Sequence, residues 1–376
     1  MSTPSCLLHW QADSRPADLS RRIAEQFLST VPDYYKPENG YRGNTGYGFG
    51  REIQYSVVSL WVNALECARL TGDTALEGRL VAAFEPYYGP KAGILPKFKH
   101  VDFTIIGAVP LEIAILTGDA RARALGLAYA DMQWEEPKPD DPPPWYNKTP
   151  YEERLAWWKQ GYSDQTRLWI DDTYMMGALQ TQAYRLTGDR KYVDRIAREM
   201  VLYLDRLQQP NGLFFHAPEA PFFWGRGNGW MAGAMPLILK HLPEDSAFRD
   251  RILEGYRKMM ATILATQHED GMWGQLVDDP DAWGESSGTG MFASSMADGI
   301  RLGWLDPGRY GPAMRRAYYA LAARMDEWGN IASTSHGLPA QQTREKYIGH
   351  PRVNGDSHGQ AAMLWLCRAL LESAKS

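Results

Sequence analysis

Apolar residues recur every three or four positions along most of the chain, which is the spacing of an amphipathic helix. Between residues 57 and 68, for example, the apolar positions are Val57, Leu60, Trp61, Ala64, Leu65 and Ala68. Alternating strand patterns are scarce. The periodicity predicts about twelve helices. We expect them near residues 18–31, 52–70, 74–85, 103–116, 120–132, 171–186, 190–207, 228–241, 245–266, 289–303, 310–328 and 357–374.

The tetrapeptide Leu-Thr-Gly-Asp occurs three times, at residues 70–73, 116–119 and 186–189. Each copy follows one amphipathic stretch and precedes another. Glycine can end a helix in the left-handed conformation, and aspartate can cap the helix that follows. Repeated helical hairpins of this kind predict an all-α array that is stacked or closed. Twelve helices suit a closed (α/α)6 toroid, and an open α-solenoid is the alternative.

The chain has 376 residues, a length that on average corresponds to two or three domains. No low-complexity linker divides it, so we predict one domain over residues 1–376, with an irregular segment over residues 1–16. The longest stretch without a helical pattern covers residues 134–167 and is rich in proline and acidic residues. It is either a solvated surface excursion or a segment that packs over a cleft or against a partner subunit. The glycine-rich stretch 41–50 is a second candidate loop at the rim of a site.

Composition narrows the class of protein. The net charge of -5 argues against nucleic acid or an anionic membrane as a partner. The three cysteines, Cys6, Cys67 and Cys367, are odd in number and widely scattered, which argues against a disulfide framework. The first twenty residues lack the pattern of a secretory signal, and no stretch is long enough to span a bilayer. We therefore expect a cytoplasmic protein.

The heptapeptide at residues 224–230, Trp-Gly-Arg-Gly-Asn-Gly-Trp, is the first candidate for a binding site. Its glycines allow tight turns and close approach to a ligand. Arg226 can bind a carboxylate through two parallel hydrogen bonds. Trp224 and Trp230 offer flat apolar faces that suit the C–H face of a sugar ring. The alternative is a turn and helix start with two tryptophans in the core.

Upstream, Asp171 and Asp172 lie between aromatic residues at the start of a predicted helix. An aspartate in this position usually caps the helix, but two adjacent ones are unlikely both to do so. The other carboxyl is then free for acid–base chemistry. Like charge and poor solvation raise a carboxyl pKa, whereas a helix N-terminus lowers it, and the sequence leaves the balance open.

Together with Leu213 to His216, residues 283–292, residues 299–303 and residues 354–359, these segments resemble glycoside hydrolase family 105, the unsaturated rhamnogalacturonyl hydrolases. The chain is more loosely similar to the family 88 unsaturated glucuronyl hydrolases. The resemblance extends through most of the chain and also implies the (α/α)6 toroid.

The resemblance implies a hydration reaction rather than attack at the glycosidic carbon. The expected substrates are oligosaccharides that end in a 4,5-unsaturated uronic acid, the product of polysaccharide lyases. An acid protonates carbon 4, water adds at carbon 5, and the resulting hemiketal opens to release the remaining sugar chain. One carboxyl can serve as acid and then as base, so carboxylate spacing does not report the stereochemistry.

The resemblance also assigns roles to single residues. The catalytic aspartate falls at the first position of Asp-x-x-Tyr-Met, which is Asp171, with Asp172 as the cap. A second family aspartate matches Asp102, which would otherwise be interpreted as a helix cap. Substrate-binding roles are expected for a larger set, whose members could also be structural. This set is His216, Trp224, Arg226, Asn228, Trp230, Glu285, Ser286, Ser287 and His358.

Two other classes of protein are alternatives to this hypothesis. A sugar epimerase on the same toroid would need two facing histidines, and a glycan-binding scaffold would need no catalytic residue. Arg344 and Lys346 could meet an acidic sugar, or simply lie on the solvated surface. No zinc or calcium spacing appears, and the 225–229 segment lacks the Lys-Ser/Thr of a phosphate loop. We expect neither a metal nor a cofactor.

Overall fold

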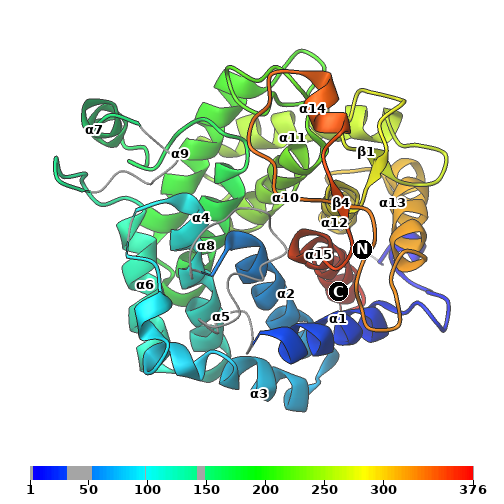
Figure 1. The fold of residues 1–376 in the computed structure, drawn as a ribbon, viewed down its shortest axis with the longest axis horizontal. Helices are drawn as coiled ribbons and strands as arrows, with labels where there is room; N and C mark the ends of the chain where they lie inside the picture. Colours follow the sequence, from blue (N-terminus) through cyan, green and yellow to red (C-terminus); the bar gives the residue numbers. More distant parts are fainter. Residues whose placement is uncertain (1–2, 32–52, 98, 142–148, 376) are drawn as a thin grey trace.

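The structure, a computed structural model, describes residues 3–31, 53–97, 99–141 and 149–375. Six helices form an inner ring and six cover it from outside (Figure 1). The inner helices are α2 (Tyr55–Thr71), α5 (Ala108–Thr117), α8 (Asp172–Thr187), α10 (Gly225–His241), α12 (Ser286–Arg301) and α15 (Ser357–Ser373). The outer helices are α1 (Pro16–Thr30), α3 (Thr74–Ala82), α6 (Ala120–Met132), α9 (Arg190–Leu207), α11 (Arg249–Ala265) and α13 (Pro307–Ala322).

The ring is closed. Each inner helix packs against the next, and the last one, α15, packs against the first, α2. This arrangement confirms the predicted (α/α)6 toroid and excludes the open α-solenoid. All twelve predicted helices are present, with ends that differ from the prediction by a few residues.

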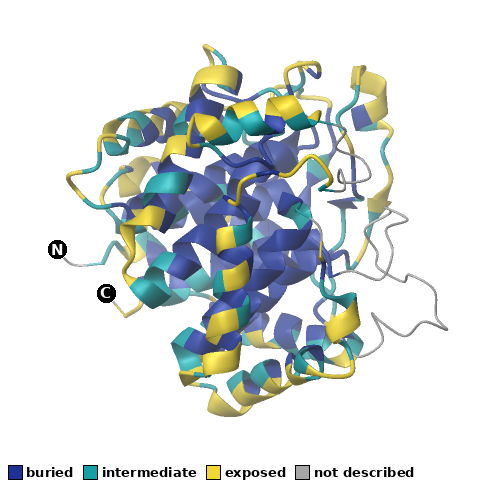
Figure 2. Ribbon diagram, turned by 90° about the vertical axis from the view of Figure 1, so that its left-hand side faces the viewer, coloured by how far each residue is buried: buried dark blue, intermediate teal, exposed yellow. Residues whose placement is uncertain are grey.

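Burial explains which helices lie inside. Outer helices such as α9 are buried on one face only, whereas nearly every residue of α12 is buried. Figure 2 shows the buried residues gathered at the centre of the molecule and the exposed ones at its periphery. Inner helices approach closely where glycine faces a neighbour. A Cβ atom built at Gly290 would lie 2.8 Å from the Cβ atom of Ala362 on α15. The small residues therefore make room for the tight inner ring.

The Leu-Thr-Gly-Asp junctions behave as predicted. Gly72, Gly118 and Gly188 have φ values of 72°, 74° and 71°, which are left-handed. The aspartate after each glycine caps the next helix, as Asp119 does by accepting from the backbone N–H groups of residues 121 and 122. The same holds for the other two copies.

Inner and outer helices alternate along the chain, so the inner helices all run in the same direction. Their N-terminal ends meet at one mouth of the toroid and their C-terminal ends at the other. The short elements before the inner helices lie at the N-terminal mouth. They are α4 (Val101–Thr104), η5 (Ile105–Gly107), β1 (Trp273–Gly274) paired with β2 (Gly284–Glu285), β3 (Thr334–Ser335) paired with β4 (Arg352–Val353), and α14 (Arg344–Ile348).

The 134–167 stretch contains a helix that the sequence analysis did not predict, α7 (Tyr151–Lys159). It follows the proline-rich part and lies outside the ring of helices (Figure 1). The expected rim loop at 41–50 lies outside the described residues, as do residues 142–148. Three further short 3-10 helices are η1 (Ser5–Leu7), η3 (Glu85–Tyr88) and η4 (Ala92–Ile94). In the described part of the chain, no helix has the length and apolar character that crossing a membrane requires.

Candidate active site

Two adjacent carboxyl groups at the start of α8 have different surroundings. Asp171 holds the N-cap position, but its side chain caps no backbone N–H group. Its Oδ2 atom is buried and has no hydrogen-bond partner among the described residues. Asp172 is fully buried and accepts from Arg167 Nε at 2.8 Å and from Tyr203 Oη at 2.8 Å. The prediction that Asp172 caps the helix is therefore wrong, because an ion pair holds its carboxylate instead.

The surroundings of Asp171 shift its pKa above the ordinary value for an aspartate. Burial, the largest cause, raises this pKa to about 7, and the Arg167 guanidinium only partly opposes it. The nearby Asp102 and Asp172 carboxylates act in the same direction as burial and contribute to this pKa. The carboxyl can therefore carry a proton at neutral pH, as a general acid must. Burial also raises the pKa of Asp172, to about 6.

Arg167 connects the acidic residues of this mouth. Its Nη2 atom lies 3.4 Å from Asp102 Oδ1, its Nε atom binds Asp172, and its guanidinium lies 4.5 Å from the centre of the Trp169 ring. The side chain is almost completely buried. Leu168, the next residue, has a left-handed φ of 59°, which is unusual for a non-glycine residue and marks a tight turn before α8.

The sequence analysis did not single out Arg167. The only available signal was a basic residue four positions before an acidic pair, which is common on solvated surfaces. Its partner Asp102 is 65 positions away in the sequence. Asp102 itself lies on α4, where His100 rather than Asp102 caps the helix. The interpretation of Asp102 as an ordinary cap therefore does not hold, and its carboxylate faces the same guanidinium as that of Asp172.

His216 faces Asp171 from the other side. Its Nε2 atom lies 3.7 Å from Asp171 Oδ2, and its ring stacks on Trp224 with centroids 4.5 Å apart. Burial and the charges of Arg167 and Arg226 lower the pKa of His216 to about 3, so the imidazole is neutral near pH 7.

Tyr347 on α14 sets the tautomer of His216. Its hydroxyl lies 2.8 Å from His216 Nδ1 and accepts from the backbone N–H of Gln341. Because the hydroxyl already accepts there, it is free to donate to Nδ1, which favours a proton on Nε2. That N–H then points toward Asp171. Sequence reasoning missed Tyr347, although it named its neighbours Arg344 and Lys346. Arg344 lies at the surface, where it binds Asp279.

Arg226 occupies a different environment from the one predicted. It is fully buried, and its Nη1 and Nη2 atoms donate to the backbone carbonyls of Ser335 and His336 at 2.6 and 2.9 Å. Its guanidinium also lies 4.6 Å from the centre of the Trp224 ring. Two of its N–H groups thus bind the 335–336 segment, whereas its Nε atom has no hydrogen-bond partner among the described residues. These contacts favour a structural role for Arg226, and its binding to the substrate carboxylate stays a prediction.

The other residues of the heptapeptide are also internal. Asn228 Oδ1 accepts from the backbone of Phe214, and its Nδ2 atom donates to the carbonyls of Phe214 and Trp224. This amide fixes the segment that carries His216. Trp230 is fully buried, with its ring centre 4.8 Å from that of Tyr174. Asn228 and Trp230 therefore pack inside the protein, and their expected contact with a sugar stays a prediction.

Glu285, Ser286, Ser287 and His358 are likewise buried and bound to protein groups. Glu285 caps α12 by accepting from the backbone N–H groups of residues 287 and 288. Ser287 donates to Glu285, and Ser286 donates to the carbonyl of Ala332. His358 lies 2.6 Å from Asp356 and 3.0 Å from Tyr55 through its two ring nitrogens. These contacts hold the four residues inside the protein, and their expected role in substrate binding stays a prediction.

The histidines do not form the facing pair that an epimerase needs. His336 and His350 stack at 6.3 Å, but His350 Nε2 binds the carbonyl of His336. Among the described residues, no group of three or more histidine, cysteine or acidic side chains could hold a metal ion. The arrangement therefore supports proton transfer by a buried carboxyl, with a neutral imidazole beside it.

Comparison with known proteins points to one family. The model of Glycosyl Hydrolase Family 88 matches residues 20–373. An unsaturated 3S-rhamnoglycuronyl hydrolase from Alteromonas sp. (strain LOR) is 32% identical over 180 residues, covering 45% of this chain and 44% of that protein. The unsaturated rhamnogalacturonyl hydrolase YesR of Bacillus subtilis is 26% identical over 211 residues, covering 51% of this chain and 57% of that protein. The matches thus span about half the length of these curated relatives.

The fold is shared more widely. A solved structure of a possible member of the GH105 family from Klebsiella pneumoniae superposes with a TM-score of 0.78. It has 19% sequence identity, and the match covers 98% of this chain and 95% of that one. At this identity the likeness shows the fold, which agrees with the closed toroid described above.

Proposed function

The chain belongs to Glycosyl Hydrolase Family 88, and we propose that it removes a terminal 4,5-unsaturated uronic acid from oligosaccharides produced by polysaccharide lyases. The family, the names of the curated relatives and the chemistry of the N-terminal mouth support this proposal. In this proposal residues 1–376 act as one catalytic domain.

The observation that carries the proposal is the buried, unpartnered carboxyl of Asp171, whose pKa is raised to about 7. In the protonated form Asp171 donates its proton to carbon 4 of the unsaturated ring. The ring oxygen stabilises the cation that forms at carbon 5. Water then adds at carbon 5 and returns a proton to the Asp171 carboxylate. The hemiketal opens to a ketone at carbon 5 and leaves a hemiacetal at carbon 1. This hemiacetal collapses to an aldehyde and releases the leaving sugar as an alcohol, while Asp171 is already protonated for the next cycle.

The neighbouring residues take supporting roles. His216, with its Nε2–H beside Asp171, orients the acid and donates to the sugar. Arg167 holds the carboxylates of Asp102 and Asp172 and keeps negative charge from accumulating around Asp171. Trp224 supports the His216 ring from below. Arg226 is assigned a structural role, which is to tie the 333–336 segment to the mouth.

The test follows the ultraviolet absorbance of the conjugated enol acid while a panel of lyase-generated unsaturated oligosaccharides is turned over. Asp171→Asn should reduce the rate by about 10²–10⁴-fold, or about 3–5 kcal/mol of barrier, while substrate still binds. Asp172→Asn is the matched control. It should cost less, because the acid itself remains in place.

Isotope labelling distinguishes hydration from ordinary glycoside hydrolysis. In heavy-oxygen water the label should enter carbon 5 of the uronate. A saturated uronide of the same linkage should be inert, because it has no double bond to protonate. Label at the anomeric carbon, or equal turnover of the saturated compound, would show that the protein is an ordinary glycosidase.

A further inference from the structure

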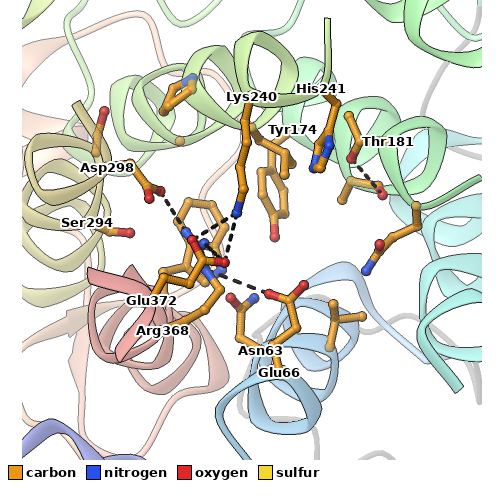
Figure 3. Close-up of a pocket in the computed structure, with 18 of the residues that line it drawn as sticks. Asn63, Glu66, Tyr174, Thr181, Lys240, His241, Ser294, Asp298, Arg368 and Glu372 are labelled. Carbon is orange, nitrogen blue, oxygen red and sulfur yellow. Dashed lines mark hydrogen bonds and ion pairs between the residues drawn. The ribbon is translucent and has the colours of Figure 1, made fainter. Parts of the chain in front are cut away.

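A cavity of about 230 Å³ lies among the inner helices (Figure 3), with residues near their C-terminal ends in its lining. Side chains from α2, α8, α10, α12 and α15 line it, most of them from the middle and later turns of these helices, whereas Tyr174 belongs to the first turn of α8. Its volume is below the range of about 300–1,000 Å³ that is typical of sites for drug-sized ligands. The cavity therefore has room for one small ring, not for an oligosaccharide.

Aromatic rings line the inner part of this cavity. Tyr174 and Trp365 lie there with ring centres 4.3 Å apart, and the Trp230 ring packs against Tyr174. All three side chains are buried. Tyr174 lies three residues after Asp171, but Asp171 itself does not line the cavity.

Six of the seven charged residues that line the cavity form ion pairs, and the seventh, Arg69, is exposed to solvent. Lys240 binds Glu372 at 2.8 Å, Arg368 binds Asp298 at 2.8 Å, and Arg185 binds Glu66 at 2.9 Å. Each of these three lining carboxylates has a basic partner (Figure 3). An anion or a cation entering the cavity would compete with these pairs and lose its own hydration. The lining therefore favours an uncharged ligand.

Three neutral polar groups face the cavity with hydrogen-bonding capacity to spare. Asn63 donates to the carbonyl of Ser59, but its Oδ1 atom accepts no hydrogen bond within the described ranges. The hydroxyl of Ser294 and the ring nitrogens of His241 also make no hydrogen bond to any described residue. Burial, the largest cause, and Lys240 lower the pKa of His241 to about 3, so its ring offers one donor and one acceptor at neutral pH.

We propose that this cavity is a second binding site, which takes one uncharged monosaccharide ring. Hydroxyl groups both donate and accept, which matches the mixture of Asn63, Ser294 and His241. The C–H face of a pyranose can lie against the Tyr174 and Trp365 rings. The paired carboxylates and guanidinium groups can bind further hydroxyls without a change in net charge. The site does not depend on the proposed hydrolase reaction, since none of the residues assigned to that reaction lines it.

Binding is tested by titration calorimetry and saturation-transfer NMR on the full chain. Rhamnose and galactose serve as uncharged probes, and galacturonate serves as the charged probe. Ser294→Leu fills the cavity, and His241→Leu removes its neutral donor and acceptor. Each should weaken binding of the uncharged sugars about tenfold or more. Ser373→Ala is the matched control, because that hydroxyl donates to the Ala369 carbonyl and does not line the cavity.

A variant at the N-terminal mouth, Trp169→Ala, distinguishes the two sites and should leave binding of the uncharged sugars unchanged. Thermal unfolding shows whether each variant is folded. Because two independent cavity variants are made, the test can still be carried out if one of them does not fold. Loss of binding in Trp169→Ala but not in the cavity variants would overturn the proposal. Tighter binding of galacturonate than of the neutral sugars, or no binding of either neutral sugar, would overturn it as well.

Discussion

Replacing Arg167 with glutamine tests how the N-terminal mouth controls its acid. Glutamine keeps much of the volume of the side chain but removes the charge between Asp102 and Asp172. Arg167 Nε lies 2.8 Å from a carboxylate that is fully buried. Breaking a buried ion pair by removing one partner typically costs about 3–5 kcal/mol of stability. Here the loss should depend on pH, because Asp172 can take up a proton.

The sign of this dependence follows from the pKa values. Arg167 lowers the pKa of both Asp171 and Asp172, which burial has already raised to about 7 and 6. Without Arg167 both pKa values rise further above their unfolded values near 4. The stability lost in the variant is then small at pH 4, where both carboxyls are protonated in the folded wild type and in the folded variant. It grows as pH rises, and is largest above the folded pKa values.

Activity should respond in the same direction. If protonated Asp171 is the acid, its higher pKa moves the alkaline limb of kcat/KM upward by about one pH unit or more, the lower end of the usual effect of a neighbouring opposite charge. The measurement is the rate of absorbance loss from an unsaturated disaccharide between pH 5 and pH 9. Denaturant unfolding at pH 5 and pH 8 gives the stability.

The chain offers a matched control in Arg185. This arginine also bridges two carboxylates, Glu66 and Glu112, but at the C-terminal mouth. Arg185→Gln should lose stability without moving the pH profile of kcat/KM. An unchanged profile in Arg167→Gln, or an equal shift in Arg185→Gln, would refute the assignment of Arg167 to the control of the acid.

Three further predictions follow from burial and packing. Arg226→Lys should lower the free energy of unfolding by about 1–3 kcal/mol, because the Ser335 carbonyl loses a charged donor. A raised KM with an unchanged free energy of unfolding would instead show that Arg226 binds the substrate. Gly290→Ala should cost about 1–3 kcal/mol in thermal unfolding, because its Cβ atom would lie 2.8 Å from that of Ala362; an unchanged Tm would contradict the close helix packing. Burial raises the pKa of Glu199 to about 7, so its ionisation costs stability as pH rises through neutrality. Relative to the wild type, Glu199→Gln should therefore gain about 2–3 kcal/mol between pH 5 and pH 8, and a gain that does not depend on pH would contradict this cause.

The fold could be predicted because its signals are local. A Leu-Thr-Gly-Asp junction needs only its own residues to end one helix and start the next, as Gly118 and Asp119 do. Periodicity over ten or more residues then identifies the helix. The helix α7 was missed because nearby prolines dominate the composition of its stretch, although its own nine residues contain none.

The site was harder to predict because helix capping and catalysis use the same residue types. Asp171, Glu285 and Asp356 all stand at the starts of inner helices. Glu285 and Asp356 cap their helices with the side chain, and Asp171 does not. This difference depends on groups from distant segments, such as the Ser335 N–H that Glu285 accepts. No pattern within one segment could reveal it.

The direction of the inner helices explains how one mouth can attract an acidic sugar although Arg226 is bound elsewhere. Six helix N-termini meet there. The carboxylates of Glu285 and Asp356 cap two of them, and each of the others carries about half a positive charge from its first N–H groups. This field stabilises an anionic ligand, but it also favours ionisation of any carboxyl at the same place. An acid that must hold a proton near pH 7 therefore has to be desolvated strongly enough to overcome that field. Asp171 meets this requirement, since its side chain is buried and burial is the largest cause of its raised pKa. Burial of Asp171 is accordingly part of the chemistry of the mouth, and a substitution that let water reach it should lower its pKa and weaken the acid without touching the reacting atoms.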